Sequence, residues 1–264
     1  MKRILSICLI VACFLIPCQV QVKATGEGHK TLLVLGDSIA AHFGVAEEDS
    51  YEYKLKTMLS QNGEKWESIN WGVDGFTSGD LVTLLSRNLE DTQRRTELEE
   101  ADLVCISIGG NNLLQYLRSH GVSESLILGK TNWSSLLEGF QTDSPALLTD
   151  FKSDIGAIIR SIRRVNPDAT ILFQTIHNVA RDTKGSLAFL GKPHSFSSIL
   201  DPFFSPMVAA ISDLSKDYGY RVADTYTAFS NSPNEHLLRP EKIHPNEAGH
   251  TLIAEVLFDA YKSK

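Results

Sequence analysis

The chain has 264 residues, of which 42% are hydrophobic, and its formal net charge is −7 at pH 7. This length suits one domain with a core large enough to fold without disulfides, and neither a Pro/Gly/Ser-rich linker nor an internal repeat divides the sequence. Such an acidic chain has no general affinity for nucleic acids or for anionic membrane surfaces, so we expect neither as a partner.

The first residues have the pattern of a secretory signal peptide. Lys2 and Arg3 precede an apolar stretch over residues 4–20, and a small residue stands at the end of the expected leader. The stretch of about 17 residues is short for a bilayer span, which needs about 20. We therefore predict a signal peptide over 1–24, a single domain over 25–264, and a secreted, extracellular product without a stable transmembrane span.

The cysteines bear on the same question. Cys13 follows a segment that resembles a lipobox, and Cys18 follows Pro17, so a lipoprotein and a retained membrane anchor are the alternatives to cleavage. Of the four cysteines only Cys105 would remain in the mature protein, which would therefore have no intrachain disulfide. Cys105 lies in an apolar run, so we expect a buried core residue rather than a nucleophile.

Short apolar runs alternate with segments whose apolar residues recur at helical spacing. The runs predict five strands, at residues 31–35, 66–71, 103–108, 169–175 and 221–223. The spacing predicts helices around residues 53–59, 81–89, 151–165, 204–214 and 252–261. This alternation predicts an α/β fold, a three-layer α/β/α sandwich around a flavodoxin-like parallel sheet of about five strands.

Two long connections, at residues 113–144 and 178–202, are predicted to be irregular, although they contain many apolar residues. Long connections in compact domains are often functional. We expect these two either to wall an acyl pocket or cover it as a lid, or to pack against the edge of the sheet.

A few distinctive residues follow the predicted strands, where a parallel sheet places its ligand site. Ser38 follows the first strand and Gly75 the second. Asn111 follows the third strand, and His244 follows the fifth. A serine needs a nearby base to act as a nucleophile at neutral pH. Ser38 and His244 are therefore the candidate nucleophile and base of a serine hydrolase that lacks the usual Gly-x-Ser-x-Gly elbow.

Four segments resemble the sequence blocks of the GDSL, or SGNH, hydrolases, and they occur in the family's order. They are Gly-Asp-Ser at 36–38, Asn-Trp-Gly-Val-Asp-Gly at 70–75, Gly-Gly-Asn-Asn at 109–112 and Glu-Lys-Ile-His-Pro-Asn at 241–246. The family's four core residues correspond to Ser38, Gly75, Asn111 and His244. The resemblance covers nearly the whole mature chain and implies the SGNH hydrolase fold.

The resemblance also implies a carboxylester hydrolase that works through an acyl-serine intermediate and needs no cofactor. Ser38 would attack the ester carbonyl, and His244 would take its proton and return it to the departing alcohol. The oxyanion hole would consist of the backbone N–H groups of Ser38 and Gly75 and the side-chain amide of Asn111, each worth about 3 kcal/mol. Glycine lets the backbone approach the substrate without a Cβ, and a neutral amide donates where an ionised aspartate cannot.

The chain departs from the family pattern at two positions. The third block usually ends in Asp, whereas Asn112 stands there, and we expect a changed loop contact rather than lost chemistry. The acid three residues before the histidine is usually Asp, whereas here it is Glu241. Glu241 is the candidate third member of a triad, which would orient the imidazole of His244. The alternative is a dyad in which Glu241 is a solvated loop acid.

Other polar residues have structural interpretations. We expect Asp37 to brace the nucleophile loop through backbone hydrogen bonds, Asp224 to act as a turn or cap residue, and Asp74 to be structural. Residues 132–134 match a glycosylation sequon. No metal site is predicted, because metal-ligand spacing is missing among His177, His194, His236 and His250.

These features together predict a secreted lipase-like esterase or acylhydrolase, whose partner is a small-molecule or lipid ester; the oligomeric state is left open. The apolar residues of the long connections favour a lipid or medium-chain acyl ester. One alternative is a carbohydrate O-deacetylase of the same family, with a shallow site selective for acetate. The other is a catalytically inactive binding module, which the change at Glu241 favours and the four core residues oppose.

Overall fold

The computed structural model describes residues 29–61, 63–88, 91–120, 133–179, 186–189, 192–234, 236–240 and 243–263. The predicted signal peptide over 1–24 lies outside these residues, and so do Glu241 and the asparagine of the sequon. Within the described ranges, no helix is both long enough and apolar enough to cross a bilayer.

Five parallel strands form the main sheet, in the spatial order β2-β1-β3-β4-β7. They are β1 (His29–Gly36), β2 (Lys65–Gly72), β3 (Leu103–Ser107), β4 (Thr170–Gln174) and β7 (Arg221–Ala223). Numbered among themselves in chain order, the strands are arranged 2-1-3-4-5, which is the flavodoxin-like order. The predicted fold class is therefore confirmed, and each predicted strand is present.

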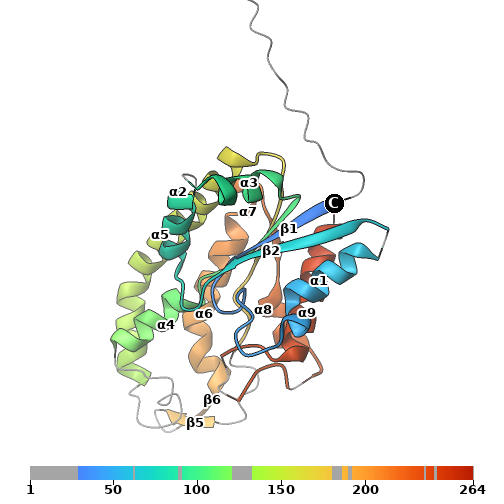
Figure 1. Cartoon of the computed structure of the whole chain (residues 1–264). Coiled ribbons are helices and arrows are strands. Elements are labelled where there is room, and N and C mark those ends of the chain that lie inside the picture. The colour runs from blue at the N-terminus through green and yellow to red at the C-terminus, as the bar shows by residue number, and fades with distance from the viewer. Residues whose placement is uncertain are drawn as a thin grey trace, which may run out of the picture.

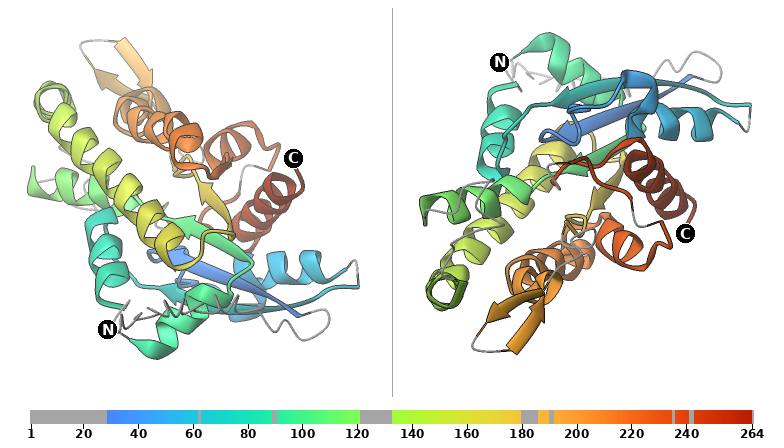
Figure 2. Two further views of the ribbon diagram at one scale, coloured as in Figure 1. Left: turned by 90° about the horizontal axis from the view of Figure 1, so that it is seen from above. Right: turned by 90° about the horizontal axis from the view of Figure 1, so that it is seen from below.

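Helices cover both faces of the sheet and give three layers (Figures 1 and 2). One face packs against α2 (Ser78–Asn88), α3 (Thr92–Glu100), α5 (Trp133–Val165) and α6 (Phe196–Asp213). The other face packs against α1 (Tyr51–Ser60), α8 (Thr225–Asn231) and α9 (Glu247–Lys262). The structure also contains η1 (Glu47–Asp49), α4 (Gly110–Ser119) and α7 (Ser215–Tyr218).

Strand β1 shows why the sheet is apolar on both faces. Leu33 and Leu35 point into the core beneath α2 and α5, whereas Leu32 and Val34 point into the core beneath α1 and α9. All four side chains are fully buried. Successive side chains of a strand point to opposite faces, so a strand covered on both sides requires a continuous apolar run.

The prediction that residues 113–144 are irregular is wrong where the structure describes this segment, at 113–120 and 133–144, and its remaining residues lie outside the described ranges. Helix α4 covers the start of this segment, and α5 begins at Trp133 and continues for 33 residues through Pro145. A proline inside a helix removes a hydrogen bond and usually breaks the helix. Here the buried ring of Phe140 lies against Phe203 of α6, with 4.5 Å between the ring centroids. Packing against the core therefore outweighs the local cost of the proline.

The prediction for residues 178–202 is also wrong in part. Strands β5 (Ser186–Phe189) and β6 (Lys192–Ser195) form an antiparallel hairpin, and α6 begins at Phe196, before its two internal prolines. Helices α3 and α8 were missed as well. Leu98 is the buried residue of the strongly charged α3, which therefore has no apolar stripe to detect. Asp224 caps α8 by accepting from the N–H of Thr227 at 3.0 Å, which confirms its predicted role.

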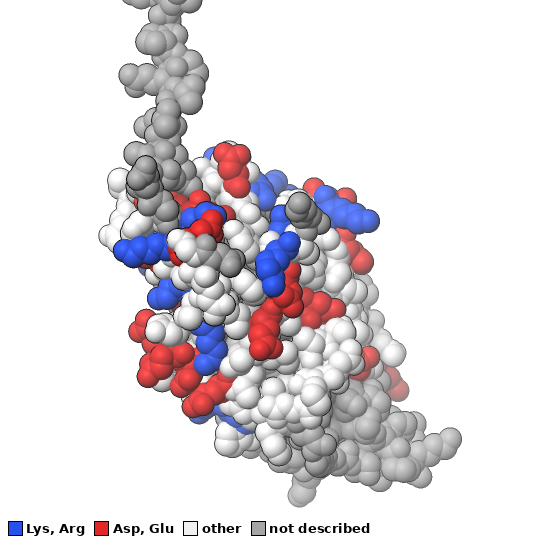
Figure 3. Space-filling view, turned by 90° about the vertical axis from the view of Figure 1, so that its right-hand side faces the viewer, with Lys and Arg blue, Asp and Glu red and all other residues white. Residues whose placement is uncertain are grey.

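Charged side chains of both signs are interspersed on the face that Figure 3 shows. The ion pairs of the described chain include Lys30–Glu64 at 2.5 Å and Lys54–Asp49 at 3.3 Å. Partly exposed pairs of this kind add little stability, because solvent screens them. The fold therefore depends mainly on its two apolar cores.

Candidate active site

Three of the predicted site residues lie at one edge of the sheet, because neighbouring strands end in register. Gly36 at the end of β1 pairs with Gly72 of β2 on one side and with Ser107 of β3 on the other. A few residues beyond these positions lie Ser38, Gly75 and Asn111. The carboxyl edge is where sheets of this type bind ligands, so the topology brings the three residues to one region.

Ser38 is presented by a tight turn that is anchored to the neighbouring strand. The backbone N–H of Asp37 donates to the carbonyl of Ser107 at 3.0 Å. Gly36 has no substitute at this point, because a Cβ would lie 2.0 Å from the same carbonyl oxygen. The Asp37 carboxylate accepts from the N–H of Ile39 at 3.1 Å, which confirms its predicted bracing role.

The carboxyl group of Asp37 titrates near neutrality. Burial raises its pKa to about 7, against the opposing effect of hydrogen bonds from the backbone N–H groups of Ile39 and Asp37 itself. The nearby charge of Asp74 raises the pKa further. A proton is therefore exchanged close to neutral pH by the residue that immediately precedes the candidate nucleophile.

His244 lies close to Ser38 in space although 206 residues separate them in the chain. Its Nε2 is 3.0 Å from the Oγ of Ser38. The segment around it is fastened on both sides: the N–H of Arg239 donates to the His244 carbonyl at 2.8 Å, and Asn246 caps α9. The ring of Phe43, from the loop that follows Ser38, packs against the imidazole with 4.5 Å between centroids.

A second histidine supports the same segment from the core. The Nε2 of buried His177 is 2.8 Å from the carbonyl oxygen of Ile243, the residue before His244. A carbonyl only accepts, so Nε2 carries the proton and donates, and the buried Nδ1 has no hydrogen-bond partner among the described residues. Burial lowers the pKa of His177 to about 4, so the ring is neutral at physiological pH. Sequence reasoning missed this support, because it depends on a tertiary contact.

Gly75 and Asn111 are linked through the loop after β2. Gly75 is exposed and has a φ of +79°, a conformation that favours glycine. A Cβ there would meet no atom of the described part of the chain within 4 Å, so conformation rather than space accounts for the glycine. Asn111 is buried in the first turn of α4, and its amide donates to the carbonyl of Phe76 at 2.9 Å. An amide has two N–H groups, so a second donor remains for an oxyanion.

Asn112, which stands where the family pattern usually has Asp, contacts Ser78 at the start of α2. Its side-chain oxygen accepts from the N–H of Ser78 at 3.0 Å, and its amide donates to the Ser78 Oγ at 2.8 Å. The Ser78 hydroxyl in turn donates to Asp154 of α5 at 2.6 Å. The chain Asn112–Ser78–Asp154 thus ties α4, which carries Asn111, to the start of α2, just after the loop of Gly75. The pattern of donors follows from the amide, since a carboxylate could not donate to Ser78.

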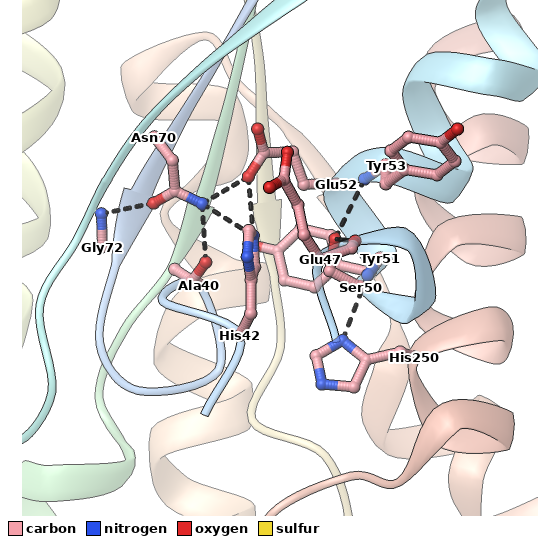
Figure 4. A network of polar contacts seen from close by, with 10 residues as sticks. All are labelled: Ala40, His42, Glu47, Ser50, Tyr51, Glu52, Tyr53, Asn70, Gly72 and His250. Carbon is pink, nitrogen blue, oxygen red and sulfur yellow. Dashed lines mark hydrogen bonds and ion pairs between the residues drawn. The ribbon is translucent and has the colours of Figure 1, made fainter. Parts of the chain in front are cut away.

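A polar network holds residues 40–42 of the loop that follows Ser38 (Figure 4). His42 has a φ of +61°, unusual outside glycine, and its Nε2 lies 2.7 Å from a carboxylate oxygen of Glu52. The amide of Asn70 donates to the carbonyl of Ala40 at 2.8 Å and also to Glu52. Burial by itself raises the pKa of Glu52, but hydrogen bonds from His42, Ser68 and Asn70 outweigh it and hold the pKa below its usual value. The network therefore fixes a strained part of the loop to α1 and β2.

Three further residues were singled out from the sequence. Asp74 is exposed beside Gly75. Cys105 is fully buried in β3, where burial raises the pKa of the thiol and keeps it protonated, so its predicted place in the core is confirmed. Glu241 lies outside the described residues, and its role as the third triad member stays a prediction.

Comparisons with known proteins agree with this architecture. The model of the GDSL-like Lipase/Acylhydrolase family matches residues 34–252. The chain is 24% identical over 242 residues to the uncharacterized protein YpmR of Bacillus subtilis (strain 168), an alignment that covers 89% of this chain and 83% of that protein.

Two solved structures share the fold. The lipase Lip_vut3 from a goat rumen metagenome has a TM-score of 0.65 at 17% identity, covering 88% of this chain and 97% of its own. Axe2, an acetylxylan esterase from Geobacillus stearothermophilus, has a TM-score of 0.57 at 15% identity, covering 89% and 95%. Since the family model spans most of the sequence, the chain belongs to the GDSL-like lipase/acylhydrolase family and is a carboxylic ester hydrolase.

Proposed function

We propose that this hydrolase cleaves esters through an acyl-serine intermediate on Ser38, with His244 as the general base. The supporting observation is the 3.0 Å distance between the His244 Nε2 and the Ser38 Oγ. That distance is within hydrogen-bond reach, and a hydroxyl becomes an effective nucleophile when a positioned base takes its proton.

In the first half of the proposed reaction, the Ser38 Oγ bonds to the ester carbonyl carbon as its proton passes to His244. The carbonyl electron pair moves onto the oxygen, and the backbone N–H groups of Ser38 and Gly75 and the amide of Asn111 bind the resulting oxyanion. The tetrahedral species then collapses and breaks the bond to the alkoxy oxygen. His244 returns the proton to that oxygen, and the alcohol leaves.

The second half repeats the sequence with water as the nucleophile. His244 takes a proton from water as its oxygen bonds to the acyl carbon, and the same donors bind the oxyanion. Collapse returns the proton to the Ser38 Oγ and releases the carboxylic acid. The Asn112–Ser78–Asp154 chain and His177 keep the groups that bind and move protons in place throughout.

Covalent labelling tests this proposal. A fluorophosphonate probe should label the wild-type protein and the Ser86→Ala control, which removes an exposed serine of α2. Labelling should be lost in Ser38→Ala and strongly reduced in His244→Ala. A well-folded wild-type protein that is not labelled, or a Ser38→Ala variant that is, would refute the assignment.

We further propose Glu241 as the third member of the triad. It stands three residues before His244, and a carboxylate there would orient the imidazole and stabilise its charged form. Glu241→Gln should lower kcat by orders of magnitude while leaving the thermal unfolding temperature unchanged. Nearly unchanged turnover would instead support a Ser38–His244 dyad.

For the substrate, we propose a lipid or medium-chain acyl ester, on the basis of the apolar residues in the long connections. The similarity to Axe2 and the exposure of Gly75 favour a second candidate, removal of acetyl groups from carbohydrate. Rates on p-nitrophenyl esters from acetate to octanoate separate the two. Retained activity at octanoate supports the lipid ester, and a sharp preference for acetate supports the deacetylase.

We also propose that residues 1–24 are a signal peptide and that the enzyme is secreted. N-terminal sequencing of protein recovered from the medium of an expressing cell should begin at Thr25. Retention in the membrane with Met1 intact, or lipid attached to Cys13 or Cys18, would support the anchor or the lipoprotein instead.

A further inference from the structure

One large apolar side chain is exposed beside the reacting groups. Phe43 is 43% exposed, although its ring packs against the imidazole of His244 with 4.5 Å between centroids and an interplanar angle of 36°. The backbone N–H of Phe43 donates to the carbonyl of Ser38 at 2.9 Å. The ring is therefore tied to both members of the Ser38–His244 pair while much of its surface faces solvent.

The backbone holds this ring in a fixed place. Arg239 donates from its backbone N–H to the His244 carbonyl, and from its guanidinium to the carbonyl of Gly44, the residue after Phe43. Gly44 has a φ of +79°, and a Cβ there would lie 2.3 Å from the Arg239 guanidinium carbon. On the other side, His42 is bound to Glu52. An exposed aromatic ring held in this way is pre-organised to contact a ligand.

The chemistry decides which part of the substrate the ring faces. The oxyanion donors follow β1, β2 and β3, so the carbonyl oxygen of the ester points toward Gly75 and Asn111. The alkoxy oxygen must point toward His244, because that imidazole returns the proton to the departing alcohol. The first carbons of the alcohol therefore lie next to the imidazole and its packing partner, Phe43.

We propose that Phe43 forms the alcohol subsite of this enzyme and selects esters of apolar alcohols, those with an aromatic ring above all. This inference rests on the proposed acyl-serine mechanism. Aromatic pairs gain about 0.5–1.5 kcal/mol beyond area burial, so loss of the ring should change selectivity about three- to tenfold. The acyl chain extends from the carbonyl carbon away from the alkoxy oxygen and from His244. Phe43 should therefore not affect selectivity for the acyl group.

The test compares benzyl and ethyl esters with the same acyl group, whose alcohols have similar acidity. In Phe43→Ala, the benzyl-to-ethyl ratio of kcat/KM should fall about three- to tenfold, while the acetate-to-butanoate ratio for benzyl esters stays unchanged. Phe43→Leu, which keeps an apolar side chain, should give an intermediate value. Tyr53→Ala is the matched control, since it removes an exposed aromatic ring from α1 and should leave both ratios unchanged.

A second measurement uses the reverse of the same step. The acyl-enzyme formed from p-nitrophenyl acetate is offered benzyl alcohol in water, and the benzyl acetate formed is compared with the acetate released. Phe43→Ala should lower the yield of benzyl acetate by a similar factor, because the incoming alcohol occupies the same subsite.

The outcomes separate the subsite from the mechanism. Equal losses on benzyl and ethyl esters would show that Phe43 only packs against His244, and unchanged values on both would show that the alcohol does not contact the ring; either result overturns the subsite. Activity that survives Ser38→Ala would instead overturn the acyl-serine mechanism on which it rests.

Discussion

Replacing Asp37 with asparagine tests the electrostatics of the turn that carries Ser38. Burial raises the pKa of this carboxyl from 3.8 to about 7. The folded protein therefore binds this proton more tightly than the unfolded chain does, so the contribution of Asp37 to stability falls as pH rises from 3.8 to 7. The difference between the pKa values of the folded and unfolded states corresponds to about 4 kcal/mol of lost stability, and the loss is complete above pH 7. The asparagine side chain would be neutral at every pH and could still accept from the N–H of Ile39.

We therefore expect Asp37→Asn to match the wild type near pH 4 and to exceed its free energy of unfolding by about 3–4 kcal/mol at pH 8. Urea unfolding at pH 4.5, 6 and 8 measures this difference. Asp150→Asn, at an exposed position in α5, is the control and should show no gain that grows with pH. A variant less stable than the wild type at pH 8, or a difference independent of pH, would refute the reasoning.

Three further predictions concern the supports of the site. The contribution of His177 to stability should fall as pH drops from 6.5 to 4, because the unfolded chain protonates this imidazole first. His177→Gln should therefore remove about 3 kcal/mol of this pH-dependent contribution in urea unfolding. Asn112→Asp would place two carboxylates against the single hydroxyl of Ser78 and should lower the free energy of unfolding by about 2 kcal/mol. Adding Asp154→Asn should restore this stability, and a double variant without rescue would contradict the pattern of donors. Gly36→Ala should cost at least about 3 kcal/mol by thermal unfolding, because its Cβ would overlap a carbonyl of β3, and a silent substitution would show that the turn can shift.

The sheet was predictable because its strands carry their own signal. Strand β1 ends in a continuous run of buried residues, which are apolar because helices cover both faces of the sheet. A short run of this kind is typical of a buried parallel strand. The positions after the strands followed from the topology, which is why Ser38 and His244 could be paired across the chain. The signals that failed were local ones: the apolar spacing predicted a helix only from residue 151, whereas α5 begins at Trp133, and the charged α3 has no apolar stripe to detect.

The residues that support the site were not predictable for a different reason. His177 donates to Ile243 across 66 residues, and Asn112 meets Asp154 only through Ser78. Each contact joins two elements whose relative placement depends on packing, and no spacing in the sequence encodes it. Asn112 could be recognised as a departure from the family pattern, but its donor role required the position of Ser78.

The division of the Ser38–His244 pair between the two ends of the chain has a consequence for biosynthesis. Ser38, the proposed nucleophile, follows β1, the first strand of the described residues, and His244, the proposed base, precedes α9, the last helix described. In the proposed mechanism, a polypeptide truncated by premature termination before residue 244 has the Ser38 hydroxyl but lacks the imidazole that deprotonates it. We therefore expect a fragment that ends before residue 244 to be inert toward esters.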